Sequence, residues 1–268
     1  MALPIAVRPS LAAAASGILA LAYFTYASWA GDLRHVVDVL LVFGGLFVTT
    51  VAMRAARVEG TIGRLIQAGY PLLFWPLLYE QAVRTVMLRP DRYVDPVLMQ
   101  IDSLVVRGTT VLLGGPIEEL ASLFYVSYYG MLPLGFLLLW RRDPTQASRY
   151  TTSLLVAFTG CALLWLAVPA GGIHPGGCPT GPAFGPFTEL AHSVYAANPH
   201  FAAAFPSSHV ALSVAAAATL RRAGAGRWVW LWALGVALAT VVGQYHFSLD
   251  ALAGWIVGLF AARRAQAE

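Results

Sequence analysis

The stretch Phe205-Pro-Ser-Ser-His-Val-Ala-Leu-Ser-Val-Ala-Ala-Ala-Ala-Thr-Leu-Arg-Arg222 starts with a polar cluster and continues as an apolar run. Pro206 suits the first position of a helix, because its φ is fixed there and its missing N–H costs no hydrogen bond. The run approaches the about 20 residues that a helix needs to cross the hydrocarbon core of a bilayer. We therefore predict that 205–222 is a membrane helix that opens at Pro206.

Seven further apolar stretches have the same character, at 10–30, 36–53, 65–80, 117–140, 151–168, 228–245 and 251–262. Segment 10–30 is long enough to span and shows no convincing cleavage site, so we expect a membrane helix there rather than a signal peptide. Pro71 and Pro76 interrupt segment 65–80, which fits either a kinked span or a re-entrant segment. The predicted fold is all-α: a single integral membrane domain over 1–268, a polytopic bundle of six to eight transmembrane helices with extracytoplasmic interfacial segments.

The composition supports this fold class. Hydrophobic residues make up 58% of the 268 residues and charged residues 11%, with a mean hydropathy of +0.67. Soluble globular proteins average about 45–50% apolar and about 25% charged residues. A soluble domain, a disordered chain and a nucleic-acid-binding module are therefore excluded as interpretations.

The basic residues predict an orientation. All 17 are arginine, and if Arg8 lies inside and the spans alternate, 12 arginines fall on the side of the termini and 5 on the other. The positive-inside rule then predicts cytoplasmic termini, in what we expect is a bacterial cytoplasmic membrane. The polar segments 84–115 and 170–204 would lie on the extracytoplasmic side.

Two groups of polar residues could carry chemistry. Ser207, Ser208 and His209 stand at a predicted helix start, where unpaired amides favour an anion. His246 and Asp250 are four residues apart and hence neighbours on one helix face, so the carboxylate can orient the imidazole. The alternatives are an ordinary helix start with a capping histidine and a structural His–Asp pair. The predicted topology brings both histidines to the extracytoplasmic face.

Other polar residues fit structural roles better. Glu118 and Glu119 follow Pro116 at a helix start, where carboxylates suit the helix dipole, although a proton relay is the alternative. Cys161 and Cys178 are expected as two free thiols. No metal site is expected, because the remaining candidate ligands have irregular spacing: His174, Cys178, His192 and His200.

The chain also resembles a known family. Phe205-Pro-Ser-Ser-His-Val-Ala211, followed by His246-Phe-Ser-Leu-Asp-Ala-Leu-Ala-Gly254, is similar to the membrane-embedded type 2 phosphatidic acid phosphatase superfamily. Within it, Asn198-Pro199 and Asp102-Ser-Leu-Val-Val-Arg-Gly108 resemble the inositol phosphorylceramide synthase-like subset. The resemblance covers 84–262 as a phosphatase- or phosphotransferase-like core, whereas 1–60 matches only as two additional membrane helices.

This resemblance implies a phosphohistidine mechanism. His246 would attack phosphorus, Asp250 would orient it and balance its charge, and His209 would protonate the leaving oxygen. Ser207 and Ser208 would hold the phosphoryl oxygens together with nearby backbone amides.

The sequence departs from the family pattern in three places. Ser208 replaces the usual glycine, Ala239 and Thr240 replace a Ser-Arg pair, and Ala82 stands at the lysine position before Arg89-Pro90. Arg84 and Arg89 are therefore the first candidates for phosphate binding, with Arg92 and Arg107 behind them. A surface or lipid-headgroup role for these arginines is the alternative.

The function expected from the sequence is that of a membrane lipid phosphatase or phospholipid-headgroup phosphotransferase. The substrate would be a lipid phosphate or phospholipid, with water or a lipid alcohol as the acceptor, and the reaction would need neither metal nor cofactor. The alternative is a non-catalytic lipid-binding protein or a transporter that uses the same polar cluster for recognition.

Overall fold

The computed structural model describes residues 10–56, 60–105, 115–173, 183–196 and 202–267, and this part of the chain contains helices and no strands. In chain order the helical elements are α1 (Leu11–Ala30), α2 (Leu33–Val39), the π-helical η1 (Leu40–Gly44), α3 (Gly45–Ala55), α4 (Thr61–Val86), the 3₁₀ turn η2 (Pro90–Arg92), α5 (Asp95–Val105), α6 (Pro116–Arg142), α7 (Pro144–Ala167), α8 (Pro186–Ala196), α9 (Ser208–Arg222), α10 (Trp228–Val242) and α11 (Ser248–Arg264). Each predicted apolar stretch falls on one of these helices, except 36–53, which falls on the continuous run of α2, η1 and α3, and this confirms the all-α fold class.

Four stretches of the described chain are long and apolar enough to cross a membrane: α1, the continuous run Leu33–Ala55, α6 and α7. Helix α10 is equally apolar but shorter. Helix α4 runs for 26 residues and includes both Pro71 and Pro76. This helix is long enough to span but is not among the four apolar stretches, so the kinked-span and re-entrant alternatives for 65–80 both stay predictions.

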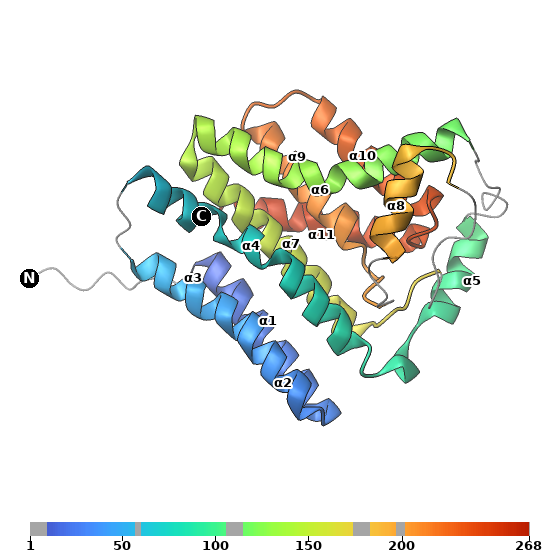
Figure 1. The fold of residues 1–268 in the computed structure, drawn as a ribbon, viewed down its shortest axis with the longest axis horizontal. Helices are drawn as coiled ribbons and strands as arrows, with labels where there is room; N and C mark the ends of the chain where they lie inside the picture. Colours follow the sequence, from blue (N-terminus) through green and yellow to red (C-terminus); the bar gives the residue numbers. More distant parts are fainter. Residues whose placement is uncertain (1–9, 57–59, 106–114, 174–182, 197–201, 268) are drawn as a thin grey trace, which may run out of the picture.

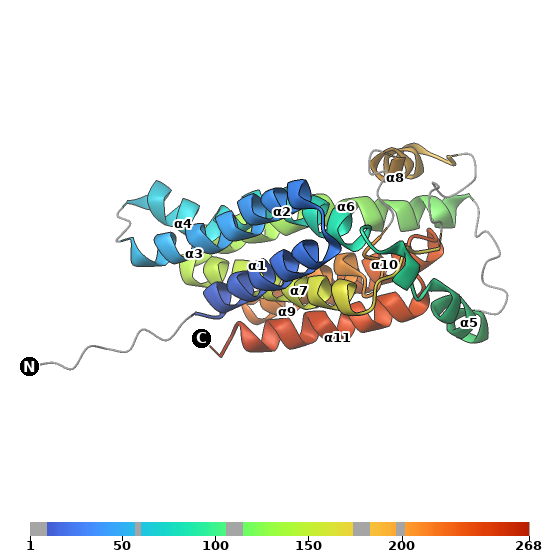
Figure 2. The same cartoon turned by 90° about the horizontal axis from the view of Figure 1, so that it is seen from below.

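Helix α9 forms the centre of the bundle. Its residues are buried along almost the whole length, and it contacts α6, α7, α10 and α11. Helix α7 in turn separates α9 from the N-terminal helices α1 and α4 (Figure 1). The short helices α5 and α8 lie at the same end of the bundle, on different sides of it (Figure 2). That end carries the starts of α9 and α11, and therefore both histidine sequences.

Helices α9 and α11 pack unusually closely. A side chain at Gly254 would overlap the carbonyl oxygen of Ser207, and one at Gly258 would overlap that of Ala211. Small residues four positions apart allow two membrane helices to approach backbone to backbone. The contact brings the first turn of α11 against the first turn of α9, and the Ser207 N–H donates a hydrogen bond to the Asp250 carbonyl at 3.0 Å.

Ten of the fourteen described arginines gather at the opposite end of the bundle. They lie near the chain reversals that join α3 to α4, α6 to α7 and α9 to α10, and near the end of α11: Arg54, Arg64, Arg141, Arg142, Arg149, Arg221, Arg222, Arg227, Arg263 and Arg264. This separation is the one on which the predicted orientation rests. Which side of the membrane each end faces stays a prediction.

Candidate active site

The start of α9 is built around Ser207. This residue is the N-cap of the helix, and its hydroxyl accepts the N–H of Val210 at 3.4 Å. Trp165 on α7 donates from Nε1 to the Pro206 carbonyl at 3.0 Å, which fixes the approach to the cap. The prediction that Pro206 opens the helix was wrong by two positions, because a serine that caps the amides marks the start instead.

His246 and Asp250 form the expected pair, in a different setting. The distance from His246 Nδ1 to Asp250 Oδ2 is 3.3 Å, and both residues are buried. However, α11 begins only at Ser248, so His246 precedes the helix and the two residues do not share a helix face. Asp250 Oδ2 also accepts the Phe247 N–H at 3.0 Å, as a helix-capping carboxylate does.

This pairing prepares the imidazole for chemistry. A carboxylate beside Nδ1 keeps the proton on that nitrogen and leaves the Nε2 lone pair available. The carboxylate also balances the positive charge that develops when Nε2 forms a bond. Because Asp250 is fully buried, its charge acts in a medium that screens it far less than water does.

His209 lies across from His246 inside a shell of tyrosines. The centroids of the two imidazole rings are 6.0 Å apart. Tyr125 stacks on His209 at 5.1 Å, Tyr128 packs at 4.7 Å, and the Tyr129 hydroxyl lies 3.3 Å from His209 Nε2. The Nδ1 atom is buried, and no described group hydrogen-bonds to it. Nε2 is therefore the atom of His209 through which protons can move.

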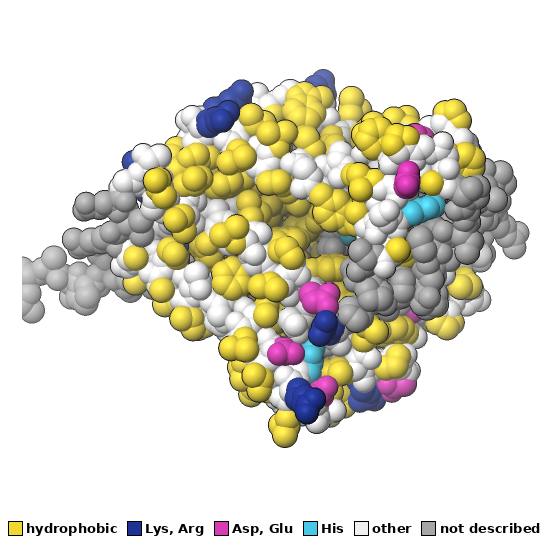
Figure 3. All heavy atoms as spheres, viewed as in Figure 1, with side chains coloured by type: hydrophobic (Ala, Val, Ile, Leu, Met, Phe, Trp, Pro, Cys, Tyr) yellow, Lys and Arg dark blue, Asp and Glu magenta, His cyan; other side chains and the backbone are white. Residues whose placement is uncertain are grey.

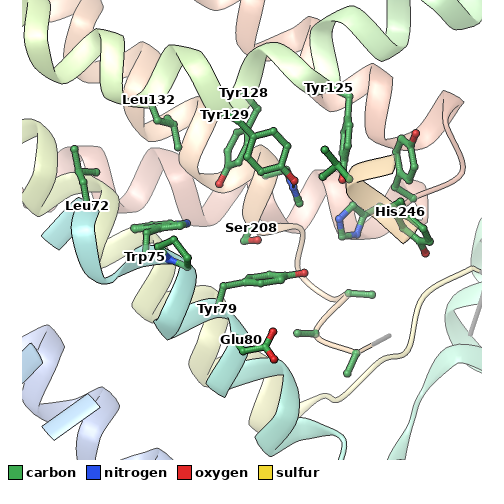
Figure 4. A pocket seen from close by; sticks show the side chains of 18 of the residues that line it. Leu72, Trp75, Tyr79, Glu80, Tyr125, Tyr128, Tyr129, Leu132, Ser208 and His246 are labelled. Atoms are coloured by element: carbon green, nitrogen blue, oxygen red, sulfur yellow. The ribbon is translucent and has the colours of Figure 1, made fainter. Parts of the chain in front are cut away.

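Both histidines line one cavity of about 530 Å³ (Figure 4). Ser208 and Tyr129 lie beside the histidines, whereas Leu72, Trp75 and Leu132 line a more distant, apolar part between α4 and α6. Figure 3 shows the corresponding hollow in this face of the molecule, bordered mostly by hydrophobic side chains. The cavity thus joins a polar site to an apolar compartment of the size that drug-like or lipid groups occupy.

The predicted phosphate-binding arginines each pair with a carboxylate. Arg84 Nε contacts Glu80 Oε1 at 2.7 Å, and Glu80 lines the cavity. Arg89 forms two hydrogen bonds to Asp91, at 3.0 and 2.9 Å, and its guanidinium lies 4.7 Å from the Trp29 ring. This bonding lowers the pKa of Asp91 below the usual value for an aspartate. Neither arginine is a lining residue, so their phosphate-binding role stays a prediction.

The other residues that the sequence singled out either lie on or contact α8, or fall outside the described residues. Glu118 and Glu119 lie in the first turn of α6, as predicted, and Glu119 also accepts the N–H groups of Phe187 and Thr188 at 2.7 and 3.0 Å, so it caps α8 as well. His192 lies on α8 itself. Outside the described residues lie Arg8, Arg107, His174, Cys178, Asn198, Pro199 and His200.

The tyrosine shell was not anticipated from the sequence. Tyr125, Tyr128 and Tyr129 are spaced to share one face of α6, but aromatic residues at this spacing in a membrane helix usually indicate core packing or an interfacial belt. Only the fold shows that this face of α6 is turned toward the start of α9.

A search against protein-family models matches residues 110–263 to the PAP2 superfamily. The matched region contains both histidine sequences, helices α6 to α10 and nearly all of α11. It does not separate an inositol phosphorylceramide synthase-like subset from the rest of the superfamily. Searches of curated proteins and of solved structures give no match.

Proposed function

The chain belongs to the PAP2 superfamily, whose members are phosphoesterases, and from this premise we propose that it cleaves a lipid phosphoester through a phosphohistidine on His246. The observation that carries the proposal is the buried His246–Asp250 pair, which faces His209 across one cavity. A His–Asp pair with a purely structural role would need neither a second histidine nor an apolar cavity beside it.

The chemistry takes two steps. In the first, the Nε2 lone pair of His246 forms a bond to phosphorus while the bond from phosphorus to the leaving oxygen breaks, and protonated His209 supplies a proton to that oxygen from Nε2. In the second, water or a lipid alcohol attacks phosphorus, the bond to His246 breaks, and His209 takes the proton of the attacking hydroxyl. Asp250 balances the imidazolium charge on His246.

The phosphoryl oxygens need donors as charge builds up on them. Ser208 lines the cavity beside His209, so it is better placed for this role than Ser207, which is buried and caps the helix. The start of α9 adds backbone amides and the positive end of the helix dipole. Among the described arginines, Arg84 is the first candidate cation, because it pairs with a glutamate that lines the cavity.

We place the site on the extracytoplasmic side of a bacterial cytoplasmic membrane. Support comes from the charge distribution, because the starts of α9 and α11 are at the end of the bundle opposite to the arginine-rich connections. An apolar compartment beside the histidines suits a substrate whose acyl chains stay among the helices while its phosphate reaches the polar end.

The identity of substrate and acceptor is tested with the purified protein in nanodiscs. A panel of phospholipids and lipid phosphates is supplied with and without ceramide, diacylglycerol or inositol lipids, and the products are analysed by mass spectrometry. Release of inorganic phosphate from a lipid phosphate, or of the phosphorylated headgroup from a phospholipid, identifies water as the acceptor. A new phospholipid identifies a lipid alcohol, as a phosphorylceramide synthase would produce. Binding of these lipids without turnover would favour the lipid-binding or transport alternative.

The roles of the two histidines are distinguished by an assay for phosphoenzyme, which uses a ³²P-labelled substrate, rapid quench and alkaline gels. His246→Ala removes the atom that bonds phosphorus, so both turnover and phosphoenzyme should be lost. His209→Gln keeps the nucleophile but loses proton donation, which lowers turnover by about 10²–10⁴-fold while phosphoenzyme still forms from a substrate with a good leaving group. Phosphoenzyme in His246→Ala but not in His209→Gln would reverse the two roles.

A further inference from the structure

Helix α5 reaches the active site from a distant part of the chain. Asp102 Oδ1 accepts the N–H of Ser248 at 2.7 Å, and the Ser248 hydroxyl donates to the same oxygen. These hydrogen bonds span 146 positions in the sequence. Ser248 is the first residue of α11 and lies between His246 and Asp250 in the chain, so Asp102 holds the peptide segment that joins the two members of the pair.

Each of two carboxylates thus accepts one of the amides that begin α11. Asp250 accepts the Phe247 N–H, and Asp102 accepts the next one, that of Ser248. The first amides of a helix have no partner within the helix, and negative charge beside them is favoured by the helix dipole. Without Asp102, the Ser248 amide would have to find water, and the turn that sets the distance from His246 to Asp250 would loosen.

Helix α5 is itself fixed against both catalytic segments. Leu98 is buried in a cluster with Ala204 and Phe247, which adjoin the Pro-Ser-Ser-His sequence and His246 respectively. At the start of α5, Asp95 accepts the N–H groups of Gly171 and Gly172, at 2.8 and 2.7 Å. Asp102 therefore projects from a helix that is anchored on two sides, rather than from a free surface segment.

We propose that Asp102 is a positioning residue that holds His246 in hydrogen-bonding distance of Asp250. The proposal rests on the proposed function for its catalytic consequence, since Asp102 acts on turnover only through His246. It does not assign a role in substrate contact to Asp102.

Two variants remove the interaction from opposite sides. Asp102→Ala removes the acceptor, whereas Ser248→Pro removes both donors. Proline is well tolerated at the first position of a helix, and the extended Phe247 (ψ 154°) suits a following proline, so Ser248→Pro should leave α11 intact. Because a displacement of about 1 Å can cost 10²-fold in rate, we expect either variant to lower kcat by about 10- to 100-fold with KM little changed.

Two further variants serve as controls. Asp102→Asn keeps an oxygen that can accept the Ser248 N–H, so it should retain kcat within a few-fold of the unaltered chain. Ser103→Ala changes the exposed neighbour of Asp102 on the same helix and should have no effect. A loss in Asp102→Asn equal to that in Asp102→Ala would show that charge rather than positioning matters, and would overturn the proposal.

A readout independent of turnover completes the test. In protein labelled with ¹⁵N-histidine, the Nδ1 proton of His246 gives a downfield resonance that reports its hydrogen bond to Asp250, assigned by its loss in His246→Ala. This resonance should shift or broaden in Asp102→Ala and Ser248→Pro and persist in Asp102→Asn. An unchanged resonance in the first two variants overturns the proposal. If the unaltered chain turns over no lipid phosphate, the proposed function fails and this resonance alone decides the role of Asp102.

Discussion

Gly254→Ala tests whether the close contact between α9 and α11 sets the geometry of the site. The added carbon would overlap the Ser207 carbonyl oxygen and would lie 3.2 Å from Val210 Cβ, whereas ordinary contacts begin at 3.4 Å. Because the oxygen belongs to the backbone of a buried cap, no side-chain rotation relieves the overlap. The two helices must move apart by about 1 Å to restore normal carbon–oxygen contact.

The displacement of the two helices determines the expected losses of stability and of kcat. Overpacking of a tight core costs about 1–3 kcal/mol, which lowers the melting temperature by about 2–4 °C per kcal/mol in a chain of this size. The separation also shifts Asp250 and His246 on one side relative to His209 on the other, so we expect a fall in kcat approaching about 10²-fold. Alanine favours a helix over glycine by about 1 kcal/mol, so propensity alone predicts the opposite change in stability.

The assay compares three variants in detergent and nanodiscs, by thermal unfolding and by release of lipid phosphate. Gly130→Ala is the matched control, because it lies within α6 with nothing within 4 Å of the added carbon, and it should be neutral or slightly stabilising. Gly258→Ala meets the Ala211 carbonyl one turn farther from the histidines, so it should lose stability but retain more activity. If Gly254→Ala is as stable and as active as Gly130→Ala, the reasoning is refuted.

Hydropathy predicted the helices well because it depends on local composition. The ends of the helices were predicted less well because single hydrogen bonds decide them. The predicted stretch 151–168 became α7, which begins at Pro144 because Asp143 accepts the N–H of Thr145 at 2.8 Å. Likewise the stretch 251–262 lengthened to α11, whose first turn is capped by Asp250. Apolar runs do not contain this information.

The site was predictable where the chemistry is carried by neighbours in the sequence. The spacing of His246 and Asp250 indicated their contact, although the helical setting that we assumed was wrong. By contrast, Asp102 was noted only on a surface-lying amphipathic helix and in a resemblance, with no contact predicted for it, and Tyr129 was not singled out at all. Their contacts cross 146 and 80 positions respectively, so they depend on how α5 and α6 pack. A single sequence carries no direct signal for contacts of this range.

Two remaining predictions concern metal use and orientation. Activity should persist in EDTA, because the proposed mechanism uses imidazoles and hydroxyls. It should fall in vanadate, which mimics five-coordinate phosphorus. A loss of activity in EDTA that Zn²⁺ or Mg²⁺ restores would contradict the mechanism. For orientation, Ala183→Cys is placed at the exposed approach to α8, and Ser148→Cys at the exposed start of α7 at the arginine-rich end, both in a Cys178→Ser background. The remaining cysteine, Cys161, is buried, so we expect it not to react with the reagent. In intact cells an impermeant thiol reagent should label Ala183→Cys and should reach Ser148→Cys only after lysis, since arginine-rich connections stay in the cytoplasm. The reverse labelling pattern would contradict the predicted orientation and place His246 and its lipid substrate on the cytoplasmic side.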